Sequence, residues 1–133
     1  MAEGIIAKAI PEVRVESAGT HALIGRKADP VSVQIMHDQG IDITSHIARQ
    51  LSLGMCQRAD LILVMDTAQR KYVEEQYPTV RGKVFRIADS MNKDVDDPYK
   101  LGLQDFKRAH LLIEDGAKFW IDRIKKITAQ NRR

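Results

Sequence analysis

The sequence predicts an α/β domain built on a mostly parallel sheet with helices on both faces. Helical spacing of apolar residues alternates along the chain with short runs of branched apolar residues. The clearest run, residues 61–65, is continuously apolar, as is typical of a strand buried on both faces of a parallel sheet. This alternation favours a doubly wound parallel sheet, in which ligands bind beyond the carboxyl ends of the strands.

The first part of the chain is expected to hold two helices and a strand. Apolar residues recur at helical spacing over residues 2–10, and Pro11 ends the run. Valines alternate with charged residues over 13–15, which predicts a strand. Asp29 followed by Pro30 is a helix N-cap with proline at the first helical position, so a second helix is expected from there to the next glycine.

The second part is expected to continue the alternation after the 61–65 strand. A helix is predicted over 66–77, a strand over 83–87, and a long polar loop over 88–101 of the kind that often carries function. The chain then ends in one amphipathic helix. Its apolar stripe is Leu103, Phe106, His110, Ile113, Ala117, Trp120, Ile124 and Ile127.

Size and cysteine content limit the class of protein. The 133 residues fit one domain, expected to span 1–133. Cys56 is the only cysteine, so no intramolecular disulfide can form, and a reducing compartment, the cytoplasm, is favoured. The sequence shows no secretory signal pattern and no apolar window long enough for a membrane span.

The net charge of +3 does not predict a nucleic-acid-binding protein, because aromatic residues make up only 5% of the chain. The basic residues Arg123, Lys125, Lys126, Arg132 and Arg133 gather at its end. We interpret them as the solvent-exposed side of the last helix. The alternative is that they bind an anionic substrate or partner.

Five short runs in a fixed order extend over nearly the whole chain: 15–20 (VESAGT), 28–30 (ADP), 45–51 (SHIARQL), 60–66 (DLILVMD) and 96–99 (DDPY). Together they resemble the low-molecular-weight protein-tyrosine phosphatases. The segment 23–30 is most similar to the bacterial branch that acts on tyrosine kinases of exopolysaccharide export. The resemblance implies hydrolysis of phosphotyrosine through a cysteinyl-phosphate, with no cofactor.

Members of this family carry a loop of the form Cys-x5-Arg-Ser between the first strand and the first helix. Its thiolate attacks phosphorus, and its arginine and backbone N–H groups hold the phosphate. The sequence lacks this loop, and residues 1–4 resemble the segment that follows it, so we expect an N-terminally truncated domain without its first, central strand. Cys56 is no substitute nucleophile, because Ile62 stands where the arginine is required.

The resemblance assigns roles to five residues. Asp97, before Pro98, would be the general acid and base that protonates the leaving tyrosyl oxygen and later activates water. Tyr99 would stack on the substrate ring, with Leu23 as the facing wall. Ser17 and His46 would hydrogen-bond behind the phosphate loop and support it.

Plainer interpretations of the same residues remain open. Asp96-Asp97-Pro98 is also an ordinary acidic turn, and Leu23 and Tyr99 are also simple exposed apolar surface. His21, His37 and His110 show no metal-ligand spacing, so no metal site is expected.

Two other functions compete with phosphatase activity. One is a non-catalytic module that binds a phosphoprotein or kinase. The other, arsenate reduction, uses several cysteines, and a single Cys56 argues against it. Without its central strand the sheet would also expose unpaired strand edges, so we expect weak stability as a monomer or self-association.

Overall fold

The computed structural model describes residues 1–99 and 101–131. Arg132 and Arg133 of the expected basic end therefore lie outside the described residues. The elements in chain order are α1 (Ala2–Ala9), α2 (Pro30–Asp38), α3 (Leu53–Arg58), β1 (Ile62–Val64), α4 (Thr67–Gln76), the 3-10 turn η1 (Pro78–Val80), β2 (Val84–Arg86), the 3-10 turn η2 (Asp89–Met91) and α5 (Leu103–Asn131).

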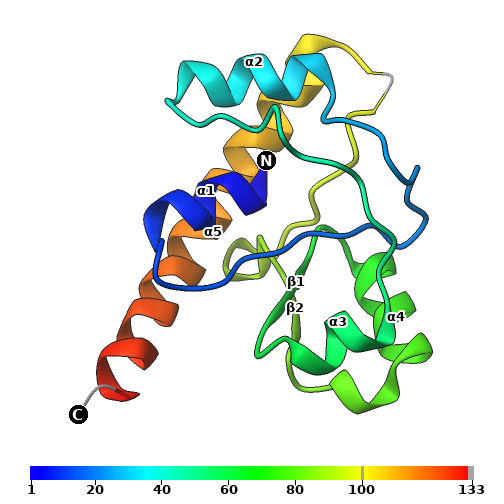
Figure 1. Cartoon of the computed structure of the whole chain (residues 1–133), viewed down its shortest axis with the longest axis vertical. Helices are drawn as coiled ribbons and strands as arrows, with labels where there is room; N and C mark the ends of the chain where they lie inside the picture. The colour runs from blue at the N-terminus through cyan, green and yellow to red at the C-terminus, as the bar shows by residue number, and fades with distance from the viewer. Residues whose placement is uncertain (100, 132–133) are drawn as a thin grey trace.

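A small parallel sheet separates two helical layers. β1 and β2 pair in parallel, with Leu63 opposite Phe85. Leu63 and Phe85 pack on the side of α1 and α5, whereas Val64 and Val84 pack on the side of α3 and α4. Figure 1 shows α1 lying along α5 on one side of the strands and α3 and α4 on the other. The predicted α/β class is therefore confirmed.

The helix boundaries follow the capping residues that the sequence contains. The Asp29 Oδ1 accepts a hydrogen bond of 2.8 Å from the Val31 N–H at the start of α2. The Asp66 Oδ1 does the same at the start of α4, accepting from Gln69 at 2.7 Å. Each cap satisfies a backbone donor that has no partner inside its helix.

The expected strand at residues 13–15 is wrong. Its side chains do alternate, because Val13 and Val15 are half-buried in the core and Arg14 is exposed. The backbone from Arg14 to Ala18, however, forms no hydrogen bond with another part of the described chain, so the segment is extended without belonging to a sheet. Alternating apolar and charged residues indicate that one side of a segment is buried, whereas a strand also requires a hydrogen-bonded neighbouring strand.

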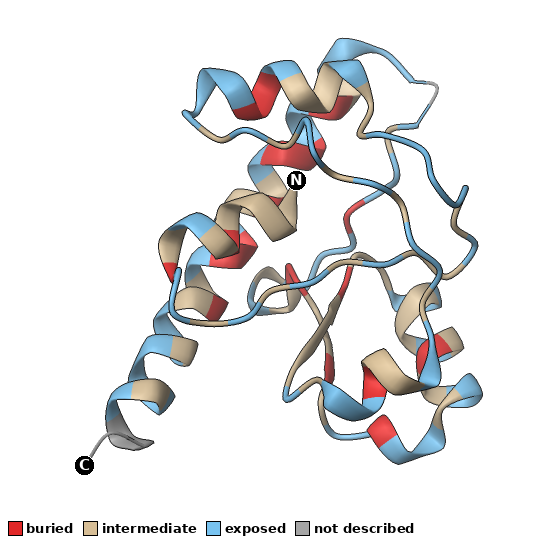
Figure 2. Cartoon of the chain, viewed as in Figure 1, coloured by how far each residue is buried: buried red, intermediate tan, exposed pale blue. Residues whose placement is uncertain are grey.

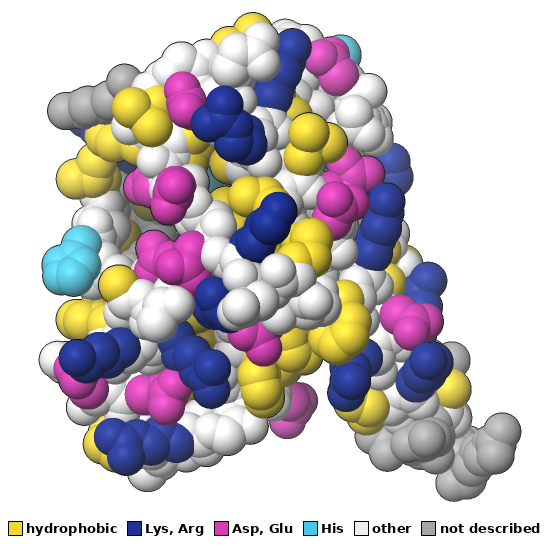
Figure 3. Space-filling view, turned by 180° about the vertical axis from the view of Figure 1, so that it is seen from behind, with side chains coloured by type: hydrophobic (Ala, Val, Ile, Leu, Met, Phe, Trp, Pro, Cys, Tyr) yellow, Lys and Arg dark blue, Asp and Glu magenta, His cyan; other side chains and the backbone are white. Residues whose placement is uncertain are grey.

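α5 is longer than its buried stripe. Its buried residues run from Phe106 to Trp120 and Ile124 still packs on the core, whereas Leu103 and Ile127, predicted at the ends of the stripe, are exposed. Figure 2 shows buried residues along the middle of this helix, and its last turns project from the body in Figures 1 and 3. Among the residues described, no helix has the length and apolar character needed to cross a membrane.

α5 approaches the backbone closely at the end of β2. Gly116 of α5 lies against the backbone of Ile87, and a Cβ on it would come within 2.8 Å of the Ile87 carbonyl carbon and closer still to its oxygen. One turn later, the Trp120 Nε1–H donates to the same carbonyl oxygen at 3.0 Å. Glycine is therefore required for this approach.

We expect Gly116→Ala to lower the free energy of unfolding by about 1–3 kcal/mol, because the added methyl group must displace backbone atoms. Alanine's higher helix propensity, about 1 kcal/mol, opposes the loss without cancelling the overlap. Gly54→Ala in α3 is the matched control, because a Cβ there meets only the end of the flexible Arg58 side chain. Urea unfolding of the two variants is the measurement. Equal stability would show that α5 does not press on Ile87.

Candidate functional site

A single open cavity of about 1220 Å³ collects most of the residues that the sequence analysis singled out. It lies at the carboxyl end of β1, where Met65 forms part of its wall, and beside the first turn of α1. Four of the five predicted site residues line it: Ser17, His46, Asp97 and Tyr99. These residues are far apart in the sequence, so the fold brings them together.

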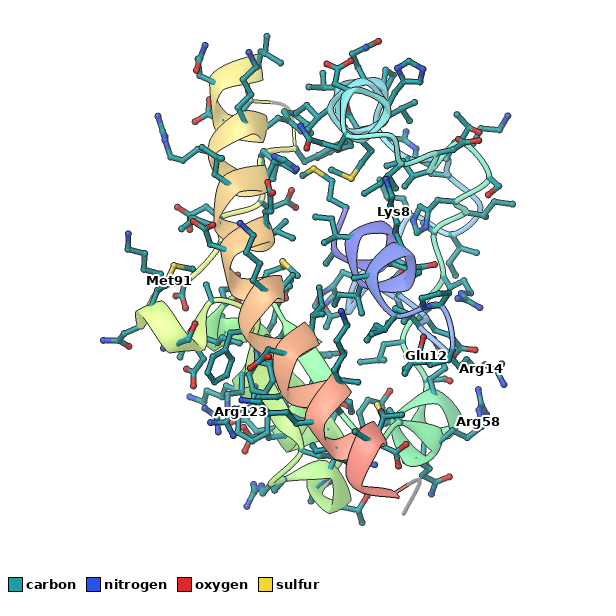
Figure 4. The ribbon with its side chains drawn as sticks, turned by 90° about the vertical axis from the view of Figure 1, so that its left-hand side faces the viewer. Lys8, Glu12, Arg14, Arg58, Met91 and Arg123 are labelled. Atoms are coloured by element: carbon teal, nitrogen blue, oxygen red, sulfur yellow. The ribbon has the colours of Figure 1, made fainter. Side chains whose placement is uncertain are left out.

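The first turn of α1 forms one wall of this cavity together with Ser17. The Ser17 hydroxyl donates a hydrogen bond to the carboxylate of Glu3, which lies in the first turn of the helix. A carboxylate at this position interacts favourably with the positive end of the helix dipole. The pair ties the extended segment around Ser17 to α1. In Figure 4, Lys8 extends from the same helix, and its Nζ donates to the carbonyl oxygens of Gln39 and Gly40, both at 3.3 Å.

His46 enters the cavity from the segment that follows α2. It is half-buried, and its backbone N–H donates to the Ile43 carbonyl at 3.1 Å. Ala48, two residues later, donates to the Arg26 carbonyl at 2.8 Å, which joins this segment to the loop around Leu23. The role of His46 in supporting a phosphate loop stays a prediction.

Asp97 lies in the loop that returns to the end of β1. The Val95 N–H donates to the Met65 carbonyl at 2.8 Å, and this bond holds the loop beside the strand end. The Asp97 Oδ1 accepts from the Tyr99 N–H at 2.9 Å, which is the local turn that an aspartate before proline commonly makes. The carboxyl group is exposed, as a group that exchanges protons with a substrate requires.

The Tyr99 side chain is bonded to the loop that also carries Leu23. Its hydroxyl accepts a hydrogen bond of 2.9 Å from the Arg26 Nη1, and 43% of the residue is exposed. Arg26 was not among the predicted site residues. No sequence signal could have found it, because the two residues are 73 positions apart and neither belongs to a regular element.

Leu23 does not line the cavity. It is 53% exposed, and its neighbour Ala22 lines the wall in its place. Leu23 lies in the same loop as Arg26, whose backbone N–H donates to the Leu23 carbonyl at 3.1 Å. Its role as a second wall for the substrate ring stays a prediction.

Cys56 is far from this chemistry. It lies in α3 at 1% exposure, within the core that also contains Val64 and Val73. Burial raises the pKa of its thiol, and Lys83 opposes that shift only in part. A buried thiol with a raised pKa is a poor nucleophile, in agreement with the interpretation of Cys56 as a small core residue.

Within residues 1–99 and 101–131, no three side chains from His, Cys, Asp and Glu converge as metal ligands would. His37 is exposed, His21 stacks on Tyr72 with ring centroids 5.2 Å apart, and His110 is buried in α5 near Glu114.

Comparison with known proteins places the chain in a family. Residues 1–130 match the family model described as low molecular weight phosphotyrosine protein phosphatase. The chain is similar to the probable low molecular weight protein-tyrosine-phosphatase EpsP of Ralstonia solanacearum, with 41% identity over 127 residues, 96% of this chain and 88% of that protein. It is also similar to the low molecular weight protein-tyrosine-phosphatase Wzb of Escherichia coli K12, with 34% identity over 90% of this chain and 82% of that protein.

Solved structures agree with the sequence matches. The Vibrio vulnificus Wzb in complex with benzylphosphonate is 31% identical, with a TM-score of 0.87 over 92% of this chain and 87% of that chain. The tyrosine phosphatase AmsI of Erwinia amylovora is 32% identical, also with a TM-score of 0.87, over 92% of this chain and 82% of that chain. Fold and sequence thus agree, and the chain belongs to the low molecular weight phosphotyrosine protein phosphatase family.

Proposed function

We propose that the cavity at the end of β1 is the phosphotyrosine site of this phosphatase and that Asp97 is its general acid and base. The observation that carries the proposal is the convergence of Asp97, Tyr99, Ser17 and His46 on one cavity beside the first turn of α1. A helix N-terminus offers backbone N–H groups and a favourable dipole to a phosphate, and an exposed carboxyl group nearby can exchange a proton with a leaving oxygen.

The proposed reaction has two steps. A thiolate attacks phosphorus, the bond to the tyrosyl oxygen breaks, and protonated Asp97 gives its proton to that oxygen. The Asp97 carboxylate then takes a proton from water, which attacks the cysteinyl-phosphate and releases phosphate and the thiolate. The thiolate and the arginine belong to the Cys-x5-Arg-Ser loop of the family, which the 133-residue sequence does not contain.

The substrate ring is proposed to lie against Tyr99. The Arg26 hydrogen bond fixes the far end of this tyrosine, so its ring is held in one orientation at the cavity. A ring carrying a phosphorus group is also what benzylphosphonate presents to the Vibrio vulnificus relative. Leu23, exposed on the loop that carries Arg26, would contact the protein around the phosphotyrosine.

We propose a bacterial tyrosine kinase of exopolysaccharide export as the phosphoprotein substrate and the cytoplasm as the location. The support is the similarity of the chain to EpsP, Wzb and AmsI. The second candidate function is a module that binds such a phosphoprotein without hydrolysing it. The observation that favours this alternative is the burial of Cys56, the only cysteine in the sequence.

We also propose that the free edge of β1 pairs with another chain. Ile62 and Val64 direct their backbone groups to β2, so the groups of Leu63 point to the opposite edge. In the described part of the chain, no backbone hydrogen bond satisfies Leu63 on that edge. Residues 14–18 also form no backbone hydrogen bond among the described residues, and Val15 of this segment packs on the same core. Unpaired rows of this kind are templates for intermolecular strand pairing.

We expect the 133-residue chain to hydrolyse no p-nitrophenyl phosphate at mildly acidic pH, because it supplies an acid without a nucleophile. Joining a segment of the family's strand and Cys-x5-Arg-Ser form before Met1 is expected to create turnover. Asp97→Asn in that longer chain should lower kcat by about 10²–10⁴-fold, the usual contribution of a general acid. The asparagine keeps the oxygen that accepts from the Tyr99 N–H, so the loop turn is preserved.

Two controls belong to this experiment. Asp96→Asn changes a neighbouring exposed carboxyl group and should leave kcat nearly unchanged, and Cys56→Ser should have no effect on turnover. Equal losses in the Asp96 and Asp97 variants would contradict the assignment of the acid. Turnover by the unextended chain that Cys56→Ser abolishes would show that Cys56 is the nucleophile after all.

The unpaired edge predicts that the apparent mass of the chain rises with concentration in sedimentation velocity. Lysine beside an open strand edge opposes strand pairing, so Val15→Lys, in the 14–18 segment whose backbone is also unpaired among the described residues, should weaken the association. Val33→Lys on α2, at a position that is also half-buried, is the control. A monodisperse monomer that unfolds cooperatively at every concentration would rule out pairing through this edge.

A further inference from the structure

The loop that carries Asp97 begins at a cluster of polar side chains that the proposed reaction does not use. Arg86 is the last residue of β2, and its side chain is 14% exposed. After it the chain turns through η2 and Asn92, which has the left-handed φ of 53°. The loop then passes Asp94 and reaches Val95 at the end of β1.

Arg86 holds three residues of this loop with one guanidinium. Its Nη1 donates to the Asp94 Oδ1 at 2.9 Å. Its Nε and Nη2 both donate to the Asp89 Oδ1, at 3.1 and 3.0 Å, and Nη2 also donates to the Asn92 Oδ1 at 2.9 Å. A planar group with five fixed donors suits this task, whereas the single charged nitrogen of a lysine does not.

Asp94 links this cluster to a second element. Its Oδ1 also accepts from the Thr67 N–H at 3.1 Å and from the Thr67 hydroxyl at 2.9 Å, at the first residue of α4. The next residue, Val95, is buried at 2% exposure and donates its N–H to Met65 after β1. Two consecutive residues, Asp94 and Val95, therefore fix the base of the loop to β2, α4 and the end of β1.

Beyond Val95 the loop turns locally, and the Leu101 N–H donates to the Pro98 carbonyl at 2.8 Å. The turn between Asp97 and the Tyr99 N–H is local, and the bond from Arg26 reaches the tip of the Tyr99 side chain. The position of the Asp97 carboxyl relative to the cavity is thus set by the point at which the loop leaves its base, two residues earlier.

We infer that Arg86 is a positioning residue for the Asp97 loop, acting through Asp94 and Val95. The inference rests on the proposed function for the role of Asp97, and it assigns Arg86 no contact with substrate. This role of Arg86 gives a physical cause for the fixed position of the Asp97 carboxyl group.

The charges in the cluster support the same conclusion. Hydrogen bonds from Arg86 first, and from Thr67 second, lower the pKa of Asp94. Hydrogen bonds to Asp94 first, and to Asp89 second, in turn raise the pKa of Arg86. Since the folded pKa of Asp94 is depressed, its stabilising contribution is present above the ordinary aspartate range and is lost as the pH falls through the depressed value.

Amide hydrogen exchange on the 133-residue chain tests the inference. We expect Arg86→Met to accelerate exchange at Val95 and Tyr99 by about tenfold, as expected for the loss of a charge-assisted hydrogen bond. Arg86→Lys should recover only part of the protection. Arg14→Met is the control, because it removes an Arg–Glu16 hydrogen bond of similar length, 2.9 Å, in the extended segment that follows α1. Unchanged exchange at Val95 and Tyr99 in Arg86→Met would overturn the inference.

The pH dependence of the Val95 amide chemical shift distinguishes a positioning role of Arg86 from a general loss of stability. The amide shift of Val95 should follow the titration of Asp94 in the unmodified chain, move to a higher midpoint in Arg86→Met, and vanish in Asp94→Asn. If Arg86→Met does not fold, Asp94→Asn, which preserves shape, should by itself accelerate exchange at Val95. A midpoint that is identical with and without Arg86 contradicts the inference. None of these measurements involves substrate, so their failure leaves the test of Asp97 by kcat untouched.

Discussion

The buried indole of Trp120 donates its N–H to the carbonyl oxygen of Ile87 at 3.0 Å, and Gly116, one turn earlier, lets the helix backbone approach the same peptide group. Ile87 directly follows β2, so this contact fixes α5 to the sheet. α1 packs on α5, and its first turn reaches the cavity. A buried carbonyl that loses its donor costs about 1–3 kcal/mol, a large part of a domain's net stability.

The same point on the chain joins the sheet to the loop of the candidate site. β2 ends one residue before Ile87 and the loop to Asp97 follows it, so anchoring Ile87 sets where that loop begins. Arg86, which precedes Ile87, then binds Asp89 and Asp94, which follow it. The loop is held at its base and left exposed at Asp97, which combines a fixed position with access to a ligand.

The sequence allowed most helices to be predicted because their signals are local. Asp29 and Asp66 cap helices as expected, and the continuous apolar run contains β1. α3 was missed, since its start depends on one serine cap in a polar stretch. The strand at 13–15 failed because pairing is a tertiary property. The four predicted site residues that line the cavity were singled out only through the family resemblance, whereas Arg26 and Arg86 depend on contacts that no spacing encodes.

Native-state hydrogen exchange of the Trp120 indole N–H tests the central role of the Ile87 contact most directly. If this contact organises the fold, the indole N–H should exchange only through global unfolding, with the same denaturant dependence as the most protected amides of β1 and α1. Exchange of the indole N–H through a local opening, with those amides still protected, would contradict the account, because the sheet and α1 would then remain in place without α5 anchored to Ile87.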